Sequence, residues 1–332
     1  MSTVAISALP AVTSSLADDV YPVVQSGVTS KITNANLFAN TFGFKNRIIN
    51  GAFNVRQYTG ISAGAGTNYA NAYVTDRWMA QSSGTTCAFT SAVAATTLPT
   101  SGVPQYALTV TANNASNTGL AIGQRVEAIN VADLHDQTVT MQAYVATSNS
   151  ATVTWTAYYA NSANTWQAPS LTTSFTTGAT SIATGTFTTT SALALKTFTF
   201  ALGTNASTNG LMIVFSCTST ATSTMTITGV QLEKGSAATS FDYRPYTTEL
   251  TLASRYYGQY GTVVGTSTFT NPIVPRTAMR ATPTVSAVSV PTGTGAAYSF
   301  STYGASTGFG VAYQSTAHSV TAQAVFTLNS EL

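Results

Sequence analysis

The chain has 332 residues, enough for roughly two or three domains. Hydrophobic residues make up 44% of it, with 16 Tyr and 15 Phe, and Thr and the aromatics favour strands, so the composition predicts an all-β protein with a sizeable core. Only 7% of the residues are charged and the formal net charge is +2, which argues against a nucleic-acid-binding domain, because such a domain presents a clustered basic face.

The first 43 residues differ from the rest of the chain. They contain two short strand-like runs, VYPVVQ (20–25) and SKIT (30–33), and then a predicted helix in NANLFANTF (34–42), with Thr33 or Asn34 as its N-cap. A segment this small cannot bury a core of its own. It is either a floppy tail or a segment that packs against a partner or sister chains. The start has no cationic stretch and no long apolar run, so we expect neither a signal peptide nor membrane insertion.

Residues 44–250 are a series of short runs in which apolar and polar side chains alternate, separated by loops rich in Asn, Ser and Gly. About eight to ten strands, each with one buried face, predict a β-sandwich or jelly roll. The runs and their predicted inward residues are YALTV (Tyr106, Leu108, Val110), LAIGQRVE (Leu120, Ile122, Val126), TVTMQAYV (Val139, Met141, Ala143, Val145), ATVTWTAYY (Val153, Trp155, Ala157, Tyr159), TFTFAL (Phe198, Phe200, Leu202), LMIVFSC (Leu211, Ile213, Phe215, Cys217) and TMTITGV (Met225, Ile227).

The two cysteines share these inward faces. Cys217 has the parity of Ile213 and Phe215, and Cys87 has the parity of Phe89. We therefore expect two buried free thiols rather than a disulfide. Neither cysteine belongs to a CxxC metal-binding spacing.

Residues 251–332 are predicted to form a third region, a small β module rich in Gly, Tyr and Phe. TTELTLASRYYGQYG (247–261) indicates a short helix or turn. The strand-like runs that follow are TVVGTSTFT (262–270), TPTVSAVSV (282–290), AAYSFSTYG (296–304), GFGVAYQS (308–315) and SVTAQAVFTLNS (319–330).

Several motifs, in a specific order and spacing, resemble a module of tailed-phage fibre and receptor-binding proteins that is itself similar to carbohydrate-binding jelly rolls. The resemblance covers about residues 44–258. It rests on KNRIINGAFNVRQ (45–57), TDRW (75–78), YALTV (106–110), GLAIGQRVEAINVADLHDQTVTMQAYV (119–145) and ITGVQLEKGSAATSFDYRPYTTELTLASRYY (227–257). ISALPAVTSSLADDVYPVVQSGVTSKIT (6–33) resembles the particle-anchoring segment of phage fibres, and TAMRATPTV (277–285) and FTLNSEL (326–332) resemble the ending of the same proteins.

The resemblance implies a virion protein, made in the host cytoplasm and located in the tail or another surface appendage. It implies three parts: a virion-anchoring segment (1–43), a carbohydrate-binding-like jelly roll (44–250) and a trimerising or receptor-contacting tip (251–332). The implied partners are two further copies in a homotrimer, another virion protein bound through residues 1–43, and a glycan of the host cell surface.

The cations of the stretch KNRIINGAF are predicted to be structural. Residues 46–53 are expected to form the opening strand of the jelly roll beside GVQLEKG (229–235), with a turn or bulge at Asn50-Gly51. Arg47 is then predicted to meet Glu233, and Arg77 to meet Asp76 or another carboxylate. We expect no cofactor, although the resemblance allows a structural calcium near the first and last strands, held by Glu233 and backbone carbonyls.

Sugar binding needs exposed aromatic rings beside polar side chains. Tyr158 faces away from the inward Trp155, and Trp166 lies in the loop YANSANTWQAPS (159–170), where a Trp is as often a loop anchor. In the last region the alternatives include Tyr303 and Tyr313, whose other interpretation is the core of a trimer. The candidate glycan-binding residues are therefore Tyr158, Trp166, Tyr303 and Tyr313. Tyr298, Phe300 and Phe309 are further alternatives in the last region.

Catalysis is not expected. A glycosidase needs two carboxylates about 5–9.5 Å apart, and the sequence has only 10 acidic residues. The trio Asp133, His135 and Asp136 resembles a loop before a strand, in which an aspartate caps a turn. The leading hypothesis is a tail fibre or spike that binds host glycans during adsorption. The alternatives are a head or tail decoration protein without a specific ligand, and a polysaccharide depolymerase.

Overall fold

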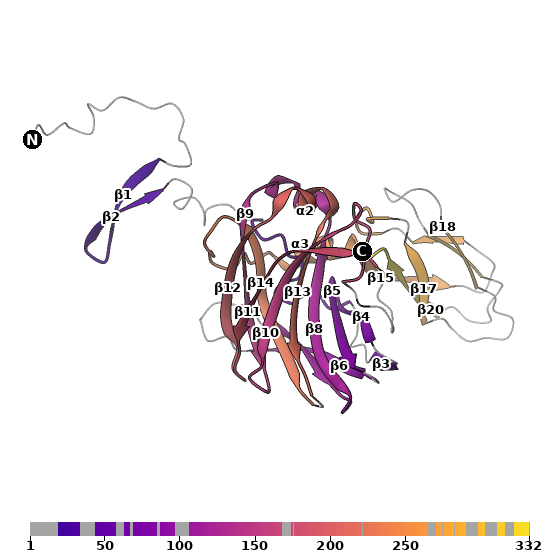
Figure 1. Cartoon of the computed structure of the whole chain (residues 1–332). Coiled ribbons are helices and arrows are strands. Elements are labelled where there is room, and N and C mark those ends of the chain that lie inside the picture. Colours follow the sequence, from indigo (N-terminus) through magenta and orange to yellow (C-terminus); the bar gives the residue numbers. More distant parts are fainter. Residues whose placement is uncertain are drawn as a thin grey trace, which may run out of the picture. The chain divides into compact units, whose positions relative to one another are not determined.

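The computed structural model describes residues 19–33, 44–57, 63–66, 69–84, 87–96, 106–167, 174, 176–220, 222–264, 270–273, 275–281, 283–289, 298–302, 311–315 and 322–331 (Figure 1). The chain divides into two compact units, residues 1–45 and residues 46–332. This division follows residue 45, whereas the expected anchoring segment ended at residue 43. The boundary expected after residue 250 falls inside helix α3 (Tyr246–Ser254) of the second unit.

The described part of the first unit is a β-hairpin. Strands β1 (Val20–Gln25) and β2 (Val28–Thr33) pair antiparallel. Ser26 and Gly27 join them with φ of 53° and 78°, as in a two-residue type I′ turn, whose twist matches that of the strands. Both predicted strands are thus confirmed. The helix predicted over residues 34–42 lies outside the described residues.

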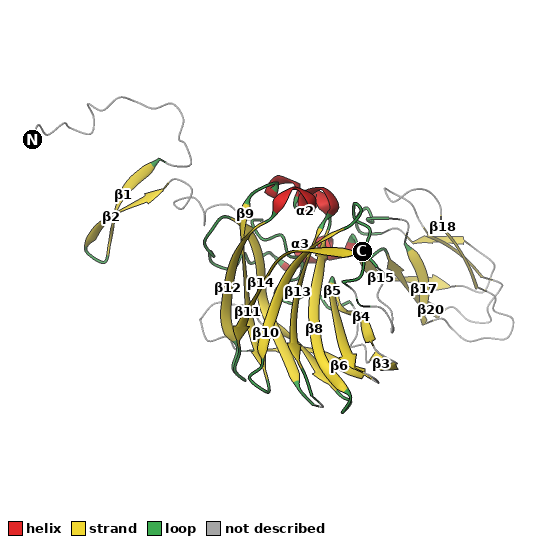
Figure 2. Cartoon of the chain, in the orientation of Figure 1, coloured by secondary structure: helices red, strands yellow, loops and turns green. Residues whose placement is uncertain are grey.

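The second unit is built on two six-stranded antiparallel sheets, which confirms the all-β sandwich (Figure 2). The order in the first sheet is β11-β10-β13-β8-β5-β4, and in the second β12-β9-β14-β7-β6-β3. The strands are β3 (Ala63–Gly66), β4 (Tyr69–Thr75), β5 (Trp78–Gly84), β6 (Cys87–Ala95), β7 (Tyr106–Ala112), β8 (Asn117–Val126), β9 (Thr138–Thr147), β10 (Thr152–Ala160), β11 (Ala179–Thr188), β12 (Ala194–Ala201), β13 (Leu211–Thr218) and β14 (Thr224–Lys234).

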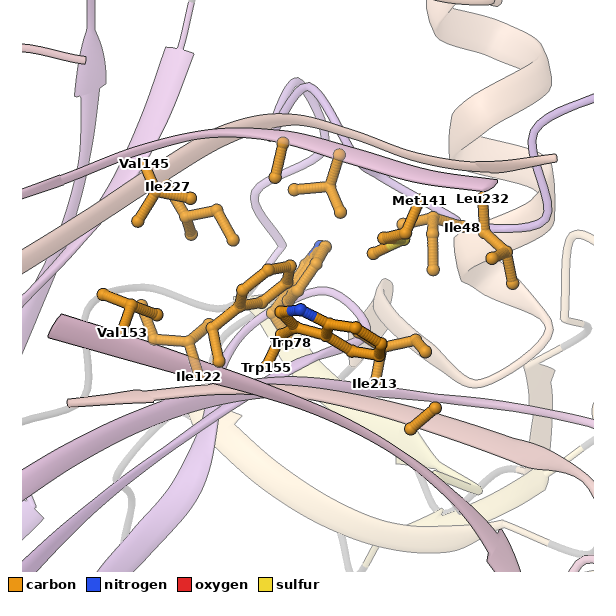
Figure 3. Close-up of a cluster of buried hydrophobic side chains, with 14 of the residues drawn as sticks. Ile48, Trp78, Ile122, Met141, Val145, Val153, Trp155, Ile213, Ile227 and Leu232 are labelled. Atoms are coloured by element: carbon orange, nitrogen blue, oxygen red, sulfur yellow. The ribbon is translucent and has the colours of Figure 1, made fainter. Parts of the chain in front are cut away.

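The main core lies between these two sheets. Figure 3 shows Val145 and Ile227 of the second sheet facing Val153 and Ile122 of the first. The predicted inward residues all belong to this core or pack against it, because successive side chains of a strand point to opposite faces. Trp155 stacks on Phe198 with ring centroids 3.9 Å apart. Figure 3 also shows Trp78, which was not predicted as a core residue, at the centre of the cluster.

The stretch from Asn46 to Phe53 is not a strand, which corrects the prediction. It is a series of turns beside β14, with Arg47 N donating to Leu232 O (2.8 Å) and Val230 N donating to Gly51 O (3.0 Å). The reason is the backbone at Asn50 and Phe53, whose φ values of 57° and 55° no extended strand can hold. The predicted turn at Asn50-Gly51 and the proximity to GVQLEKG are both present.

A second apolar cluster covers one end of the outer face of the first sheet. Its buried members include Met79 and Met212 from the sheet, Trp166 from the loop after β10, and Ala253 and Tyr256 from α3 and the residues after it. Strand β13 is therefore buried on both faces over Leu211–Phe215. Two 3₁₀ turns, η2 (Ala128–Asn130) and η3 (Ala132–Leu134), and the short helix α2 (Gly203–Asn209) complete the helical elements described in the second unit.

The remaining strands form two three-stranded antiparallel sheets, with orders β15-β20-β17 and β16-β19-β18. All the strand-like runs predicted after residue 261 contain strand. These strands are β15 (Tyr257–Val264), β16 (Thr270–Ile273), β17 (Thr284–Ser289), β18 (Tyr298–Thr302), β19 (Val311–Ser315) and β20 (Ala322–Asn329). The described helices are all too short or too polar to cross a membrane.

Candidate functional site

A groove of about 590 Å³ lies on the outer face of the first sheet, over β10, β13, β8 and β5. These four strands lie side by side in Figure 1. The side chains that face the groove are those that alternate with the inward core residues of the same strands. The groove is therefore the open part of a face whose other end is covered by the second apolar cluster.

Strand register sets the floor of the groove in rows that cross the sheet. One row runs from Gln81 on β5 through Ala121 on β8 and Ser216 on β13 to Thr154 on β10. A parallel row runs from Ser83 through Gly119 to Thr218. A Cβ on Gly119 would come within 2.7 Å of Ser83 Oγ, so any larger residue here would require the Ser83 side chain to move.

One end of the groove is apolar. Tyr158 and Val214 line it there, and both also contact the second apolar cluster. Tyr158 is half-buried and lies opposite Met212 in the strand register. An aromatic side chain at this position offers an apolar surface next to the polar rows.

Ser174, which lies between β10 and β11 in the sequence, contacts β5. Ser174 Oγ donates a hydrogen bond to Gln81 Oε1 (3.1 Å) and lies 2.9 Å from Thr176 Oγ1. Because β13 and β8 lie between β10 and β5, this contact spans two strands. Ser174 and Thr176 therefore form a wall of the groove.

The polar part of the groove lining, over the described residues, consists of uncharged side chains. Hydroxyl groups from Ser and Thr dominate it, and none of the described residues that line it is Lys, Arg, His, Asp or Glu. Each hydroxyl can donate one hydrogen bond and accept others. The arrangement can bind a ligand that carries many hydroxyl groups, and its described residues include no pair of carboxylates for acid–base chemistry.

Of the four residues predicted to bind glycans, the structure describes the side chains of two, Tyr158 and Trp166. Tyr158 lines the groove. Trp166 is only 9% exposed and lies in the second apolar cluster, with the Arg125 guanidinium 5.5 Å from its ring centroid. Its ring is therefore largely buried, as expected for a loop anchor. Tyr303 lies outside the described residues, and Tyr313 pairs with Phe300 in β18–β19 through its backbone, its side chain lying outside the described part.

Sequence reasoning missed most of the groove residues. Thr154 and Ser216 have outward parity in correctly predicted strands, so the same alternation that identified the core could have identified them. Gln81 and Ser83 lie on β5, which was not predicted as a strand. Nothing in the sequence indicates that the loop carrying Ser174 reaches β5.

Arg47 does not meet Glu233, which corrects the predicted pair. Its guanidinium donates to Asp133 Oδ2 (2.6 Å). The Glu233 carboxylate instead accepts hydrogen bonds from Gln231 Nε2 (2.9 Å) and from Thr239 N and Oγ1 (2.8 and 2.5 Å). Arg77 does meet another carboxylate, that of Glu331.

The same contacts test the calcium expectation. Both oxygens of Glu233 are occupied by hydrogen-bond donors of the protein, whereas Ca²⁺ needs several oxygens directed at one point. Over the described ranges, no three His, Cys, Asp or Glu side chains gather at one place. The residues around Glu233 therefore do not fit a calcium site.

His135 lies between a serine and an aspartate, but the arrangement does not make a nucleophile. Its Nδ1 lies 2.9 Å from Ser207 Oγ and its Nε2 lies 3.3 Å from Asp136 Oδ2. Ser207 is buried and its hydroxyl donates to Thr204 O (2.7 Å). The serine proton is thus directed at the backbone, and the hydroxyl is closed to a substrate.

No protein-family model matches the chain, and no curated protein matches it either. Similar solved structures include the enzymatically active domain of tailspike protein 4 of bacteriophage CBA120 (TM-score 0.33, 10% identity, 57% of this chain and 22% of that one). Others are TmCBM61 in complex with β-1,4-galactotriose (0.30, 11%, 57% and 99%) and a putative sugar binding protein from Bacteroides thetaiotaomicron (0.33, 12%, 57% and 100%). Identities and TM-scores of this size assign neither a family nor a ligand to the chain.

Proposed function

We propose that the chain is a non-catalytic glycan-binding protein and that the groove over β10, β13, β8 and β5 is its binding site. The observation that carries the proposal is the lining: rows of Ser and Thr hydroxyls beside Tyr158. Sugars present hydroxyl groups at their edges and apolar C–H faces between them. The polar rows of the groove match the hydroxyl groups of a sugar, and the apolar end of the groove matches its C–H faces.

The binding test uses full-length protein on a glycan array, followed by titration of the glycans that bind. Tyr158→Ala removes the apolar surface and is expected to weaken binding by about tenfold, equivalent to roughly 1.4 kcal/mol. The matched control is Tyr246→Ala, since Tyr246 is 53% exposed and lies outside the groove lining. Equal loss in both variants, or no binding to any glycan, would argue against the groove as a glycan site.

We further propose that the glycan lies on a host cell and that the protein is a trimeric fibre or spike of a tailed-phage particle. The sequence resemblance over residues 44–258 and the anchor-like residues 6–33 support this role. The hairpin β1–β2 exposes Val20, Val24 and Val28, and an isolated two-stranded hairpin is marginally stable in water, so a virion partner would stabilise it.

Deletion of residues 1–45 tests the anchoring part of the proposal. The truncated protein is expected to remain folded and to be absent from purified particles, and sedimentation of the intact protein is expected to give a trimer. Incorporation of the truncated protein would contradict the anchor. If particles carry the intact protein but the protein binds no glycan on the array, the result would point instead to a decoration protein without a ligand.

A further inference from the structure

The groove has a property that the proposed function does not require: none of the described residues that line it carries an ionic group that could pair with a charged ligand. Of the lining residues described, only Tyr158 and Cys217 have side chains that titrate, and Cys217 is 8% exposed and belongs to the main core. The polar groups are the hydroxyls, and the amide of Gln81. Burial raises the pKa of the Cys217 thiol to about 11, so the thiol is neutral at ordinary pH.

The two arginines that lie in or next to the strands of the first sheet, Arg77 and Arg125, are too buried to contact a ligand in the groove. Arg77 and Arg125 are each 1% exposed. The Arg125 guanidinium donates to Gln167 O (2.6 Å) beside the Trp166 ring, and Arg77 pairs with Glu331. Arg125 thus lies beside the second apolar cluster, and Arg77 is covered by the residues that follow β20.

A carboxylate or sulfate in this groove would lose water without gaining an ionic partner. Burying an unpaired charge costs far more than burying a hydrogen-bonded hydroxyl. Proteins that select anionic groups place Arg or Lys against them, often in bidentate geometry. A hydroxyl-lined floor instead matches groups that both donate and accept hydrogen bonds.

We infer that the groove selects uncharged glycans and discriminates against glycans that carry uronic acid, sialic acid or sulfate groups at the bound sugars. This inference rests on the proposed function and names its ligand class. It implies an affinity that depends little on salt, because screening weakens charge–charge attraction and the described part of the lining offers no charge to a ligand.

The test uses matched polysaccharides: uronic-acid polymers, and the same polymers after reduction of their carboxyl groups to alcohols, alongside neutral members of a glycan array. Binding to the uncharged forms is expected, with the acidic forms weaker by at least about tenfold and with little change as salt is raised. Acidic forms that bind equally well or better, with affinity falling as salt rises, would overturn the inference while leaving glycan binding intact. If neither form of the polymers nor any glycan of the array binds, the proposed function and the inference are both overturned.

A designed cation provides a second measurement on the same site. Ser216→Lys places an ammonium at the centre of the row Gln81–Ala121–Ser216–Thr154 and is expected to add salt-dependent binding of the acidic polymer. Thr154→Lys serves if the first variant does not fold. The control is Thr197→Lys on β12, an exposed position of the other sheet. If the groove lysines behave like the control, the groove does not contact the charged sugars and the inference fails.

Discussion

Arg77 and Glu331 form an ion pair between side chains that are only 1% and 4% exposed, although 254 positions separate them in the sequence. Arg77 is in the turn between β4 and β5 with φ of 70°, and its guanidinium lies 3.6 Å from the ring centroid of Tyr256. Glu331 follows β20, and Ser330 N next to it donates to Tyr256 O (2.7 Å). The pair thus attaches the end of the described chain to the sandwich.

The first prediction concerns this pair. Glu331→Gln is expected to lower the free energy of unfolding by about 3–5 kcal/mol, because it leaves the buried Arg77 charge without its partner. Chemical denaturation measures the change. The matched control is Asp133→Asn, which breaks the exposed Arg47–Asp133 pair (side chains 26% and 57% exposed) and is expected to cost no more than about 1 kcal/mol. Similar losses in the two variants would show that the Arg77–Glu331 pair is open to water.

The second prediction concerns Asn50, which holds the turn beside β14. Its side-chain amide donates to Val55 O (2.8 Å) and Asp76 O (3.2 Å) and accepts from Val55 N (3.0 Å). The backbone carbonyl of Asn50 accepts a hydrogen bond from Trp78 Nε1 (3.0 Å). Asn50→Ala loses the side-chain bonds, at about 1 kcal/mol each, and also forces Ala into the left-handed region.

Asn50→Gly separates the two contributions. It loses the same side-chain bonds but tolerates φ of 57°, so it is expected to be less destabilised than Asn50→Ala by roughly 1 kcal/mol. Thermal or chemical unfolding of both variants gives the difference. If the alanine variant is as stable as the glycine variant, Asn50 does not hold the left-handed conformation in solution.

The alternation of side chains was enough to predict the main core, because each predicted strand has one face against the other sheet. It failed where a second layer covers a sheet. Met79, Met212 and Val214 are buried on the outer face by Tyr256 and its neighbours, which lie far away in the sequence. The residues of the groove have the same outward parity, so parity alone cannot separate the covered part of this face from the open part.

The opening stretch KNRIINGAF shows a second limit. Its motif correctly indicated a turn next to GVQLEKG, but not the partner of Arg47. That partner, Asp133, is on η3, and the predicted partner, Glu233, accepts its hydrogen bonds from residues within six positions of itself. The Glu233 carboxylate accepts its hydrogen bonds from nearby residues in place of Arg47. A single sequence does not show which of several possible donors a carboxylate will accept from.

The third prediction concerns the thiols, which are free and buried as predicted. Cys87 and Cys217 are 0% and 8% exposed, so native protein is expected to react slowly with a thiol reagent at neutral pH and rapidly once unfolded. Counting labelled thiols over time measures both rates. Rapid labelling of the native protein would contradict the strand register of β6 or β13.

The fourth prediction concerns the effect of pH on stability through Cys217. Burial raises its folded-state pKa from 9.0 to about 11. Below about pH 9 the thiol is protonated in both states, and stability is unaffected. As pH rises from 9 toward 11 the unfolded chain ionises first, so this group alone is expected to lower the free energy of unfolding by roughly 2–3 kcal/mol.

Cys217→Ala isolates that contribution from the buried tyrosines, such as Tyr256, whose pKa is also raised by burial. The stability of the variant relative to the parent is expected to rise by the same amount across this pH range. A constant difference between the two proteins from pH 8 to pH 11 would show that the thiol is solvated in the folded state.

The fifth prediction compares two truncations and follows from the compact unit of residues 46–332. Removing residues 1–45 takes away the separate hairpin unit and is expected to leave the stability of the sandwich unchanged. Removing residues 322–332 takes away β20, the shared partner of β15 and β17, along with the fully buried Leu328 and the carboxylate that pairs with Arg77.

The C-terminal deletion is therefore expected to destabilise the sandwich itself, not only the last strands. The unpaired Arg77 contributes about 3–5 kcal/mol of this loss, and the opened edge of β15 exposes Tyr257 and Tyr260, which are buried in the intact protein. Circular dichroism melting of the three proteins measures the effect. A sandwich that melts at the same temperature without residues 322–332 would mean that the C-terminal strands form an independent module and that the buried ion pair contributes nothing to the stability of the sandwich.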